Sequence, residues 1–366
     1  MSTLKNRYLS LDVFRGIDVA LMIIVNSPGN GKTTFSPLLH AEWNGFTLTD
    51  LVFPTFLFVV GNSMSFSMKK YEQMGNPAFF KKILKRFAII FLLGFLMYWF
   101  PFFENGQLKP LAETRIFGVL QRIALCYLFA SILLHYVKTK TAIIFSIAAL
   151  VVYHIVLIVF GDLTLTGNAV LQLDTWLIGP KHMYHGEGIA FDPEGLLSTL
   201  PAIANVVAGY LTGKFIQKKG QNFEPVAKLM MMGFALVVAG LAWDLLLPIN
   251  KKLWTSSFVL LTSGIDLCAI ALLVYILDMK KVKSWTYFFE VFGKNTLFIY
   301  LLSELFVISL FSINVNGTSL YRWIADNVFI SVAGGYIGSL LFALWIVFTC
   351  WVVGYIMDKR GIYVKV

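Results

Sequence analysis

Apolar residues run along most of the chain in blocks of about 20, separated by shorter polar or charged stretches. A helix needs about 20 such residues to cross the ~30 Å hydrocarbon core of a bilayer. Because backbone in lipid must satisfy its own hydrogen bonds, and the blocks are too long for barrel strands, each block is predicted to be a helix. Ten spans are predicted, at residues 11–27, 47–68, 84–101, 116–137, 141–160, 196–217, 226–247, 254–277, 288–311 and 336–357.

Composition strengthens this prediction. Of 366 residues, 58% are hydrophobic and 14% are charged, whereas soluble globular proteins are about 25% charged. A soluble enzyme, a disordered chain and a disulfide-rich secreted module are thereby excluded. The predicted spans occupy over half of the chain and leave no room for a separate soluble domain of ordinary size. We therefore expect an all-α, polytopic integral membrane protein, with residues 1–366 forming a single transmembrane domain.

The basic residues are divided unequally between the two sides of the predicted membrane. Loops and termini on one side carry 21 Lys and Arg residues and those on the other side carry seven, with Arg122 and Lys294 inside spans. Since cytoplasmic loops are enriched in Lys and Arg, both termini are predicted to be cytoplasmic. The net charge of +10 is then mainly a topology signal, and no nucleic-acid partner is expected.

The loops on the other side are long and rich in Gly, Asn, His, Asp and aromatic residues, at 28–46, 102–115, 161–195 and 312–335. Binding and catalytic residues concentrate in such loops. Just before the second span, His40 is followed ten residues later by Asp50. A histidine suits proton transfer near neutral pH, and a carboxylate can orient it. Asn26, at the outer end of the first span, could donate to a developing oxyanion.

The same residues also allow a structural interpretation, in which His40 and Asn44 shape a turn and Asp50 caps a helix. Asp192 and Glu194 precede the sixth span. They either begin a helix, where negative charge is favourable, or bind an amino or hydroxyl group of a substrate.

Ionisable residues inside spans are costly and are candidates for function. Gln121 and Arg122 lie in the fourth span, and Lys294 and Asn295 open the ninth. Arg122 and Lys294 are candidate anchors for an anionic ligand. Two acids, Asp266 and Glu304, could be their counter-ions. Asp12 and Arg15, three residues apart on the first helix, are expected to pair.

Several common chemistries have no motif in this sequence. It contains no P-loop, HExxH, GxSxG or CxxC pattern, so no nucleotide hydrolysis, metal site or serine nucleophile is indicated. The three cysteines all lie inside apolar blocks, without metal-ligand spacing. No metal cofactor is expected.

At its N-terminal end the sequence resembles the heparan-alpha-glucosaminide N-acetyltransferases and their bacterial relatives. The resemblance rests on residues 9–16 (LSLDVFRG), 25–26 (VN), 40–45 (HAEWNG) and 49–54 (TDLVFP). It continues in family order through residues 118–122 (GVLQR), 191–197 (FDPEGLL), 250–254 (NKKLW) and 293–297 (GKNTL). The family's active-site histidine corresponds to His40, on the side of the membrane that the charge distribution assigns as non-cytoplasmic.

The resemblance implies an acetyltransferase that takes acetyl from cytosolic acetyl-CoA and delivers it to an amino sugar across the membrane. Trp43, Asn44, Asp192 and Glu194 would then contact the acceptor, and the span-embedded Gln121, Arg122, Lys294 and Asn295 are the other candidate binding residues. In the lysosomal enzyme a large lumenal domain precedes the first span, whereas this sequence starts almost at its first predicted span, so the shorter bacterial form is the expected one. A short sugar or an envelope or imported glycan is the expected acceptor, the bacterial inner membrane the expected location, and a homodimer the expected assembly.

Two other functions remain open from sequence. The intramembrane charges and the ten predicted spans would suit a secondary transporter for an amino sugar. An acyltransferase that O-acetylates a surface glycan would use the same donor on a hydroxyl group. A transporter would not need acetyl-CoA, whereas the N-acetyltransferase would. An O-acetyltransferase would place the acetyl group on a hydroxyl group instead of an amino group.

Overall fold

The computed structural model describes residues 8–71, 74–104, 106–220 and 222–364. Lys5, Arg7 and Lys365, which entered the charge comparison, lie outside these ranges. The longer helices are α1 (Leu9–Asn26), α2 (Leu48–Tyr71), α3 (Asn76–Trp99), α4 (Val119–Tyr136), α5 (Thr139–Val159), α6 (Ala169–Ile178), α7 (Thr199–Lys219), α8 (Phe223–Asp244), α9 (Ser256–Leu273), α10 (Thr286–Lys294), α11 (Thr296–Ser312) and α14 (Gly335–Lys359).

Shorter elements complete the chain. Short helices are α12 (Leu320–Ile324) and α13 (Ser331–Ala333), with π-helical turns at Val274–Met279 and Ala325–Ile330 and 3₁₀ turns at Gly31–Thr33, Ser36–Leu38, Leu111–Glu113 and Pro180–His182. Two antiparallel hairpins pair β1 (Phe103–Glu104) with β2 (Gln107–Leu108) and β3 (Asn314–Val315) with β4 (Thr318–Ser319). The all-α prediction is therefore right except for these two hairpins, which lie in predicted outer loops.

Every predicted span falls on a helix, but one of them is broken. Six helices are long and apolar enough to cross a membrane, namely α2, α4, α5, α8, α9 with its π-helical end, and α14. The predicted ninth span is two helices, α10 and α11, which meet at 87°; counted as one span they make seven. The first span carries three charges, and the third begins with a basic run. Ten crossings therefore remain a prediction.

The break in the ninth span follows from close packing at its start. A Cβ on Gly293 would lie 2.2 Å from the Asp12 carbonyl oxygen, and one on Gly16 would lie 1.8 Å from the Phe289 carbonyl oxygen. The two glycines therefore let α10 lie directly on the beginning of α1. Asn295, between α10 and α11, uses its side chain to bind the C-terminal segment instead of continuing the helix.

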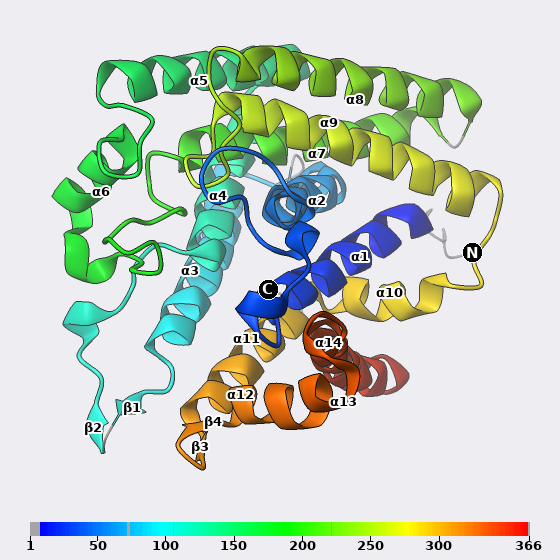
Figure 1. The fold of residues 1–366 in the computed structure, drawn as a ribbon. Coiled ribbons are helices and arrows are strands. Elements are labelled where there is room, and N and C mark those ends of the chain that lie inside the picture. The colour runs from blue at the N-terminus through cyan, green and yellow to red at the C-terminus, as the bar shows by residue number, and fades with distance from the viewer. Residues whose placement is uncertain (1–7, 72–73, 105, 221, 365–366) are drawn as a thin grey trace.

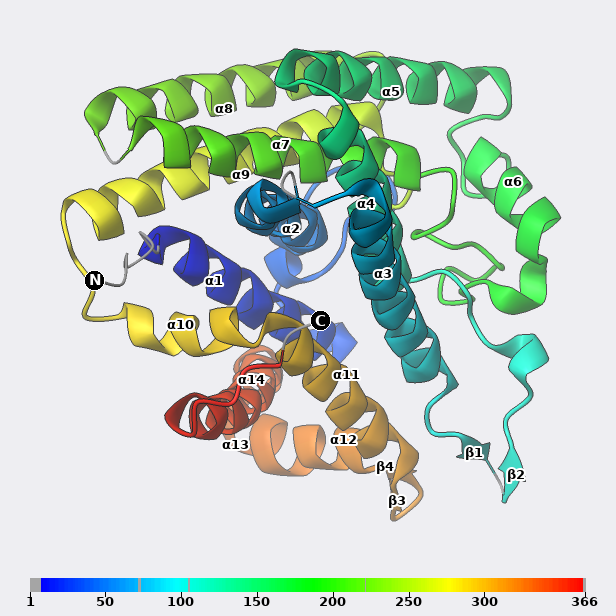
Figure 2. The same ribbon diagram turned by 180° about the vertical axis from the view of Figure 1, so that it is seen from behind.

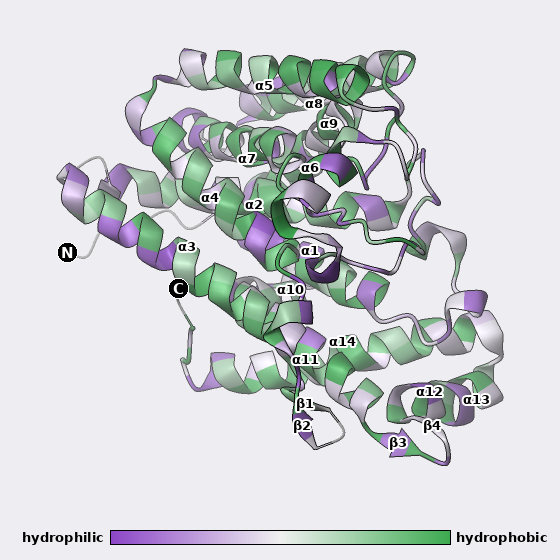
Figure 3. Cartoon of the chain, turned by 90° about the vertical axis from the view of Figure 1, so that its left-hand side faces the viewer, coloured by the Kyte–Doolittle hydropathy of each residue, from purple (hydrophilic) through white to green (hydrophobic). Residues whose placement is uncertain are grey.

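Helices α1 and α2 lie in the middle of the molecule (Figures 1 and 2). Helices α7 and α9, and beyond them α5 and α8, cover one side, and α10 to α14 cover the other. Helix α3 runs beside α4. In the most apolar stretch of α2, 72% of residues are buried, against 17% in α8 and 28% in α5. The exposed surfaces of α5 and α8 are nevertheless apolar (Figure 3), as expected for helices that face lipid.

Candidate active site

His40 lies in the loop between α1 and α2, and its ring is bonded to the first turn of α2. Its Nδ1 is 2.7 Å from Asp50 Oδ1. The Asp50 side chain is 1% exposed, whereas that of His40 is 43% exposed. When Nδ1 carries the proton that is donated to Asp50, Nε2 keeps a free lone pair. The ring therefore presents a proton acceptor or nucleophile outward, and a buried carboxylate sets its orientation.

Asp50 also caps α2. The two roles that the sequence suggested for it, orienting His40 and capping a helix, therefore occur together. Its Oδ2 accepts bonds from the backbone N–H groups of Ala41 (3.1 Å) and Thr47 (3.0 Å) and from the Thr47 hydroxyl (3.0 Å). Thr47 directly precedes the helix and Asp50 follows three residues later, which is the spacing of a capping box. One carboxylate oxygen thus caps the helix while the other holds His40.

A second segment, residues 249–252 before α9, is bonded to the loop that follows His40. It joins residues 42–45 by backbone and side-chain bonds, and these bonds fix the two loops against each other. They run from Gly45 N to the Ile249 carbonyl (2.8 Å), from Asn250 Nδ2 to Asn44 Oδ1 (3.1 Å) and from Lys252 Nζ to the Glu42 carbonyl (2.8 Å).

This contact brings Lys251 close enough for its charge to act on the histidine. The charge of Lys251 acts on His40, Asp50 and Glu194. Among the described residues its ammonium has no hydrogen-bond or ion-pair partner, whereas neighbouring Lys252 pairs with Glu187 (2.6 Å). In the sequence, Lys251 was only one of the basic residues of an outer loop. The one feature that linked it to the family was its place in the NKKLW motif.

The surroundings of His40 favour its neutral form. Burial lowers the pKa of His40, and the positive charge of Lys251 lowers it further, while the hydrogen bond and charge of Asp50 act in the opposite direction. The balance leaves the pKa below its usual value near 6.5. His40 is therefore uncharged at neutral pH, as a base or nucleophile must be.

Arg115 holds the two acids that sequence singled out before the sixth span. It donates to both Asp192 oxygens (3.0 and 2.6 Å) and to Glu194 Oε2 (2.6 Å). Its guanidinium also lies over the rings of Tyr98 and Tyr184, at 4.9 and 4.8 Å. Asp192 is 0% and Glu194 6% exposed. A bidentate guanidinium–carboxylate pair is among the stronger polar contacts in proteins.

Of the two interpretations of these acids, the one in which they begin a helix is wrong. Helix α7 begins at Thr199, so a guanidinium, and not a helix N-terminus, neutralises Asp192 and Glu194. Burial raises the pKa of Asp192. Burial acts in the same direction on Glu194, but Arg115 and Lys251 outweigh it and lower the pKa of that carboxyl. The sequence offered no signal for Arg115, which lies 77 residues from Asp192.

Arg122 binds the end of the loop that carries Asp192 and Glu194. It is fully buried on α4, donates to the Gly195 carbonyl (3.0 Å) and to the Ser198 hydroxyl, and lies 4.8 Å from the centre of the Trp254 ring. Its Nε and Nη1 have no partner in the described part of the chain. The neighbouring Gln121 is also 0% exposed, and neither polar atom of its amide has a partner there. Such groups are rare in native proteins.

Asn26 lies at the outer end of α1 and donates from Nδ2 to Glu304 Oε1 of α11 (2.9 Å). The charges of Glu304 and Arg115 both influence the hydroxyl groups of Tyr98 and Tyr300. Asn26 therefore lies near the group formed by Arg115, Asp192 and Glu194. One N–H of its amide remains for a further acceptor.

Lys294 and Asn295 lie away from the loops that carry His40, Asp192 and Glu194. Lys294 pairs with Asp358 of α14 (2.8 Å), and the Asn295 amide bonds to the Ile362 carbonyl and the Val364 N–H. Both are near the beginning of α1, since Arg15 donates to the neighbouring Gly293 carbonyl (3.1 Å). They are thus at the opposite end of α1 from Asn26.

The expected counter-ions are also wrong. Lys294 pairs with Asp358, and Asp266 accepts from Thr55 (2.6 Å). Glu304 instead accepts from Asn26. The predicted pair between Asp12 and Arg15 is confirmed at 3.7 Å.

Trp43 and Asn44 link the outer loops. The Trp43 indole donates to the Leu163 carbonyl (2.7 Å), and its ring centre lies 5.8 Å from that of Phe191. Asn44 accepts from Asn250 (3.1 Å). The loops that carry His40, Lys251 and Glu194 are thereby held together.

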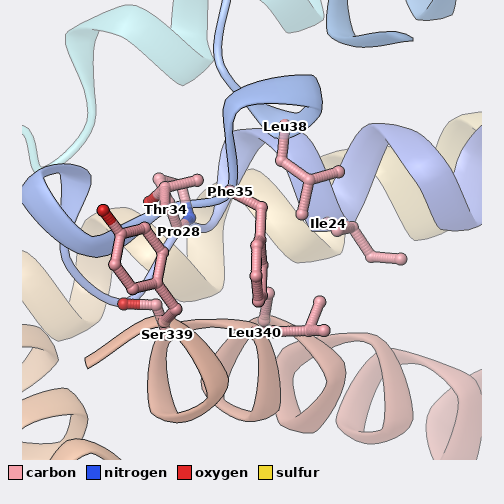
Figure 4. Close-up of a pocket in the computed structure, with 9 residues that line it drawn as sticks. Ile24, Pro28, Thr34, Phe35, Leu38, Ser339 and Leu340 are labelled. Carbon is pink, nitrogen blue, oxygen red and sulfur yellow. The ribbon is translucent and has the colours of Figure 1, made fainter. Parts of the chain in front are cut away.

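The loop before His40 is anchored to α14 (Figure 4). Phe35 points down toward Leu340, with Ile24 to one side, and its ring centre is 5.4 Å from that of Tyr336. The hollow beside it has a volume of about 10 Å³, which is room for one water molecule. It is too small for a substrate, so this contact serves to position the loop.

In the described ranges of the chain, no group of three or more His, Cys, Asp and Glu residues is placed to hold a metal ion. The outer loops bring together a histidine–aspartate pair, a lysine without a hydrogen-bond or ion-pair partner among the described residues, and two acids bound by an arginine. Together with several long apolar helices, this defines an integral membrane protein with a candidate acid–base or nucleophilic centre.

The model of the family described as heparan-alpha-glucosaminide N-acetyltransferase, catalytic, matches residues 7–247. The chain belongs to this family. The human heparan-alpha-glucosaminide N-acetyltransferase is 28% identical over 366 aligned residues, covering 84% of this chain and 54% of the relative. The mouse enzyme of the same name is 28% identical over 355 residues, covering 81% and 53%. The chain thus spans about half the length of these relatives.

Proposed function

We propose that the protein transfers the acetyl group of cytosolic acetyl-CoA to the amino group of a glucosamine-type sugar on the other side of the membrane. The observation that carries the proposal is the His40–Asp50 pair, with a free Nε2, in a chain of the N-acetyltransferase family. The relatives of this family are named for acetylation of a glucosaminide. The acceptor proposed for this chain is a short amino sugar or an envelope or imported glycan.

The proposal includes an arrangement in the membrane. Ten crossings would place both termini in the cytoplasm and His40 on the far side, in one domain over residues 1–366. The match between helices and apolar blocks supports it, as does the 21-to-seven distribution of basic residues. A bacterial inner membrane and a homodimer complete the proposal.

Two chemical routes fit the pair. In the covalent route, His40 Nε2 attacks the thioester carbon, the C–S bond breaks, and CoA leaves as the thiolate. The acceptor amine then attacks the acetyl-imidazole, the bond from the acetyl carbon to Nε2 breaks, and the freed Nε2 takes the proton that the amine loses. In the direct route, the amine attacks the thioester while Nε2 takes its proton, and the thiolate leaves in the same way. In both routes Asp50 fixes the ring and stabilises its positive charge.

Other residues would hold the reacting groups. The spare N–H of Asn26 can donate to the carbonyl oxygen as it becomes negative, and Lys251 adds a positive charge beside His40. Glu194 and Asp192, with Asn44 and Trp43 in the adjoining loop, would bind the acceptor. The unpartnered atoms of Gln121 and Arg122 would meet polar groups of acetyl-CoA. Lys294 and Asn295 are engaged with the C-terminal segment, so no contact with acetyl-CoA is proposed for them.

Purified protein incubated with labelled acetyl-CoA and glucosamine tests the reaction itself. N-acetylglucosamine is the expected product. Formation of an O-acetylated glycan with no N-acetylated product would favour the O-acetyltransferase alternative. Uptake of unmodified sugar into vesicles, with no need for acetyl-CoA, would favour the transporter and overturn the proposal.

Changing Asp50 to Asn should lower kcat by about 100-fold or more. With the amide oxygen at the cap, the NH2 group faces His40 and donates to Nδ1, which moves the ring proton to Nε2, and no negative charge remains to stabilise the imidazolium. The amide can still accept bonds from Thr47 and Ala41, so the cap of α2 should largely survive. The measurement is kcat together with the melting temperature. A fully active D50N protein would show that the pair is only structural.

Changing Lys251 to Met should move the acid limb of kcat/KM to higher pH. A histidine base works only when neutral, so activity falls as pH drops through its pKa. Lys251 lowers that pKa, and its removal must raise it. A pH–rate profile of K251M against wild type measures the shift, with K252M as the matched neighbour. An unmoved limb in K251M would contradict the placement of Lys251 beside His40.

A further inference from the structure

Asp174 lies on α6, the short helix between α5 and α7, and it is bonded to the turn that carries Asp192 and Glu194. Its side chain is completely buried, and Oδ1 accepts a bond of 3.0 Å from the Leu196 N–H. The other oxygen, Oδ2, has no hydrogen-bond partner among the described residues. A buried carboxylate with one unsatisfied oxygen is uncommon in native proteins and calls for an explanation. The proposed reaction does not use it.

The unsatisfied oxygen lies directly against the backbone of Gly195. A Cβ at that position would come within 1.7 Å of Asp174 Oδ2, so only glycine leaves room for the carboxylate. The carboxylate therefore cannot shift without displacing Gly195 or breaking its bond to Leu196. Asp174 and the turn are packed as one unit.

Two helices hold the same peptide group of this turn, the one that joins Gly195 to Leu196. Arg122 of α4 donates to its carbonyl oxygen (3.0 Å), and Asp174 of α6 accepts from its N–H. The N–H groups of Glu194 and Gly195 bond back to Asp192, at 3.1 Å each. The positions of the two acids therefore depend on how firmly this peptide group is held.

Helix α6 is a firm base for that contact. It follows α5 in the chain and packs on it (Figure 1). Ala169 and Val170 are buried in a cluster that also contains Phe191, the residue directly before Asp192. Val170 and Asp174 are four residues apart and so lie on the same face of the helix. A change at the Asp174 carboxyl is therefore transmitted to the turn and not absorbed by movement of α6.

The charged form of Asp174 is unfavourable where it lies. Burial raises its pKa to about 7, and the charge of Asp192 acts in the same direction, while the bond to Leu196 and the charge of Arg122 oppose them. The other titratable groups near it, on the elements packed against α6, are exposed or have partners of their own. They are Tyr153 and His154 of α5, bonded to the Leu253 carbonyl and to Trp243, the exposed Lys181, and His182, bonded to the Thr114 carbonyl.

We infer that Asp174 is a positioning residue for acceptor binding, and that the affinity for the acceptor follows its charge. The inference rests on the proposed function for its acceptor. An ionised carboxylate accepts a stronger bond from the Leu196 N–H than the neutral acid does, and so holds Asp192 and Glu194 more firmly. It also adds a negative charge near Asp192, which favours the ammonium form of an amino sugar. Both effects tighten acceptor binding when Asp174 is ionised.

The variant D174N mimics the protonated acid, because its amide oxygen can accept from Leu196 while the NH2 group takes the place of a protonated Oδ2. The test compares KM for glucosamine in D174N and wild type, at saturating acetyl-CoA, from about pH 5.5 to about pH 8.5. The two KM values should agree below about pH 6, and that of D174N should be about fivefold higher above about pH 8, with kcat unchanged. The acceptor amine and His40 titrate alike in both proteins, so their effects cancel in the ratio.

Melting temperature separates positioning from structural support. Because the folded protein raises the pKa of Asp174, the folded state binds the proton more tightly, and stability falls as pH rises from about 4 to about 7. At about pH 8 wild type carries the full cost of the buried charge and D174N does not, so D174N should melt no lower than wild type. The matched control is D162N, the same change at an exposed position of the same loop, which should leave KM unchanged at every pH.

A KM ratio that stays constant over the whole pH range would overturn the inference. A constant ratio of one would show that Asp174 does not influence the acceptor. A constant higher ratio, with a lower melting temperature for D174N, would show that the residue only supports the fold. In both cases acetylation of glucosamine by wild type leaves the proposed function standing. If wild type forms no N-acetylglucosamine at any pH, the proposed function itself fails and this inference falls with it.

Discussion

Replacing His40 with Ala is expected to lower acetyl transfer by about 10³-fold or more. The ring is the one group in the described site that joins a free nitrogen lone pair to an orienting carboxylate, at 2.7 Å from Asp50. Loss of a general base alone costs about 10²–10⁴ in rate, and loss of a nucleophile removes the covalent route altogether. The measurement is kcat of purified H40A against wild type.

The controls separate chemistry from folding. H185A makes the same change in another outer loop and should keep wild-type activity. H40A should melt close to wild type, because the ring is partly exposed and Asp50 retains its bonds to Thr47 and Ala41. Retention of full activity by H40A would refute the assignment. Rapid quenching with labelled acetyl-CoA in the absence of acceptor then distinguishes the routes, since only the covalent one leaves acetyl on His40.

Replacing Arg115 with Met should destabilise the protein by about 3–5 kcal/mol, since it leaves two buried carboxylates without their shared partner. Arg115 is itself only 15% exposed, so solvent cannot replace it. Acceptor binding should fail as well, because Asp192 and Glu194 would repel each other out of position. Melting temperature and the free energy of unfolding in detergent measure the first effect, and KM for the acceptor measures the second.

A matched variant identifies the cause. In R115M/D192N/E194Q the two charges are removed along with their partner, so most of the lost stability should return. Activity should stay low, since the acids themselves are absent. If the triple variant is as unstable as R115M, the loss comes from the packing of Arg115 on Tyr98 and Tyr184 and not from unpaired charge.

The helices could be predicted from the sequence because lipid allows few alternatives to a helix for a long apolar block. The break between α10 and α11 could not be predicted, because it depends on close packing between Gly293 and Gly16, which are 277 residues apart in the chain. Charges within α1 and α3 also weaken the apolar signal that defines a span, so these two helices do not stand out as spans by composition.

Part of the candidate site could also be predicted from the sequence. His40 and Asp50 are ten residues apart, so a local pattern indicated their pairing. Asn44, Trp43, Asp192 and Glu194 were predicted because they lie in the long polar loops. Partners distant in the chain gave no such signal. Arg115, Lys251 and Glu304 acquire their roles from contacts between loops and helices that only the fold creates. The partner of Lys294 is Asp358, which no intramembrane pattern indicated.

In the proposed reaction, acetyl crosses the membrane from donor to acceptor. Proteoliposomes with labelled acetyl-CoA inside and glucosamine only outside test this crossing, when the protein is inserted with its basic face inward. Labelled N-acetylglucosamine should accumulate outside, at a rate that falls to background with H40A. No labelled sugar outside, or equal transfer with acetyl-CoA and glucosamine confined to the same outer compartment, would contradict the account.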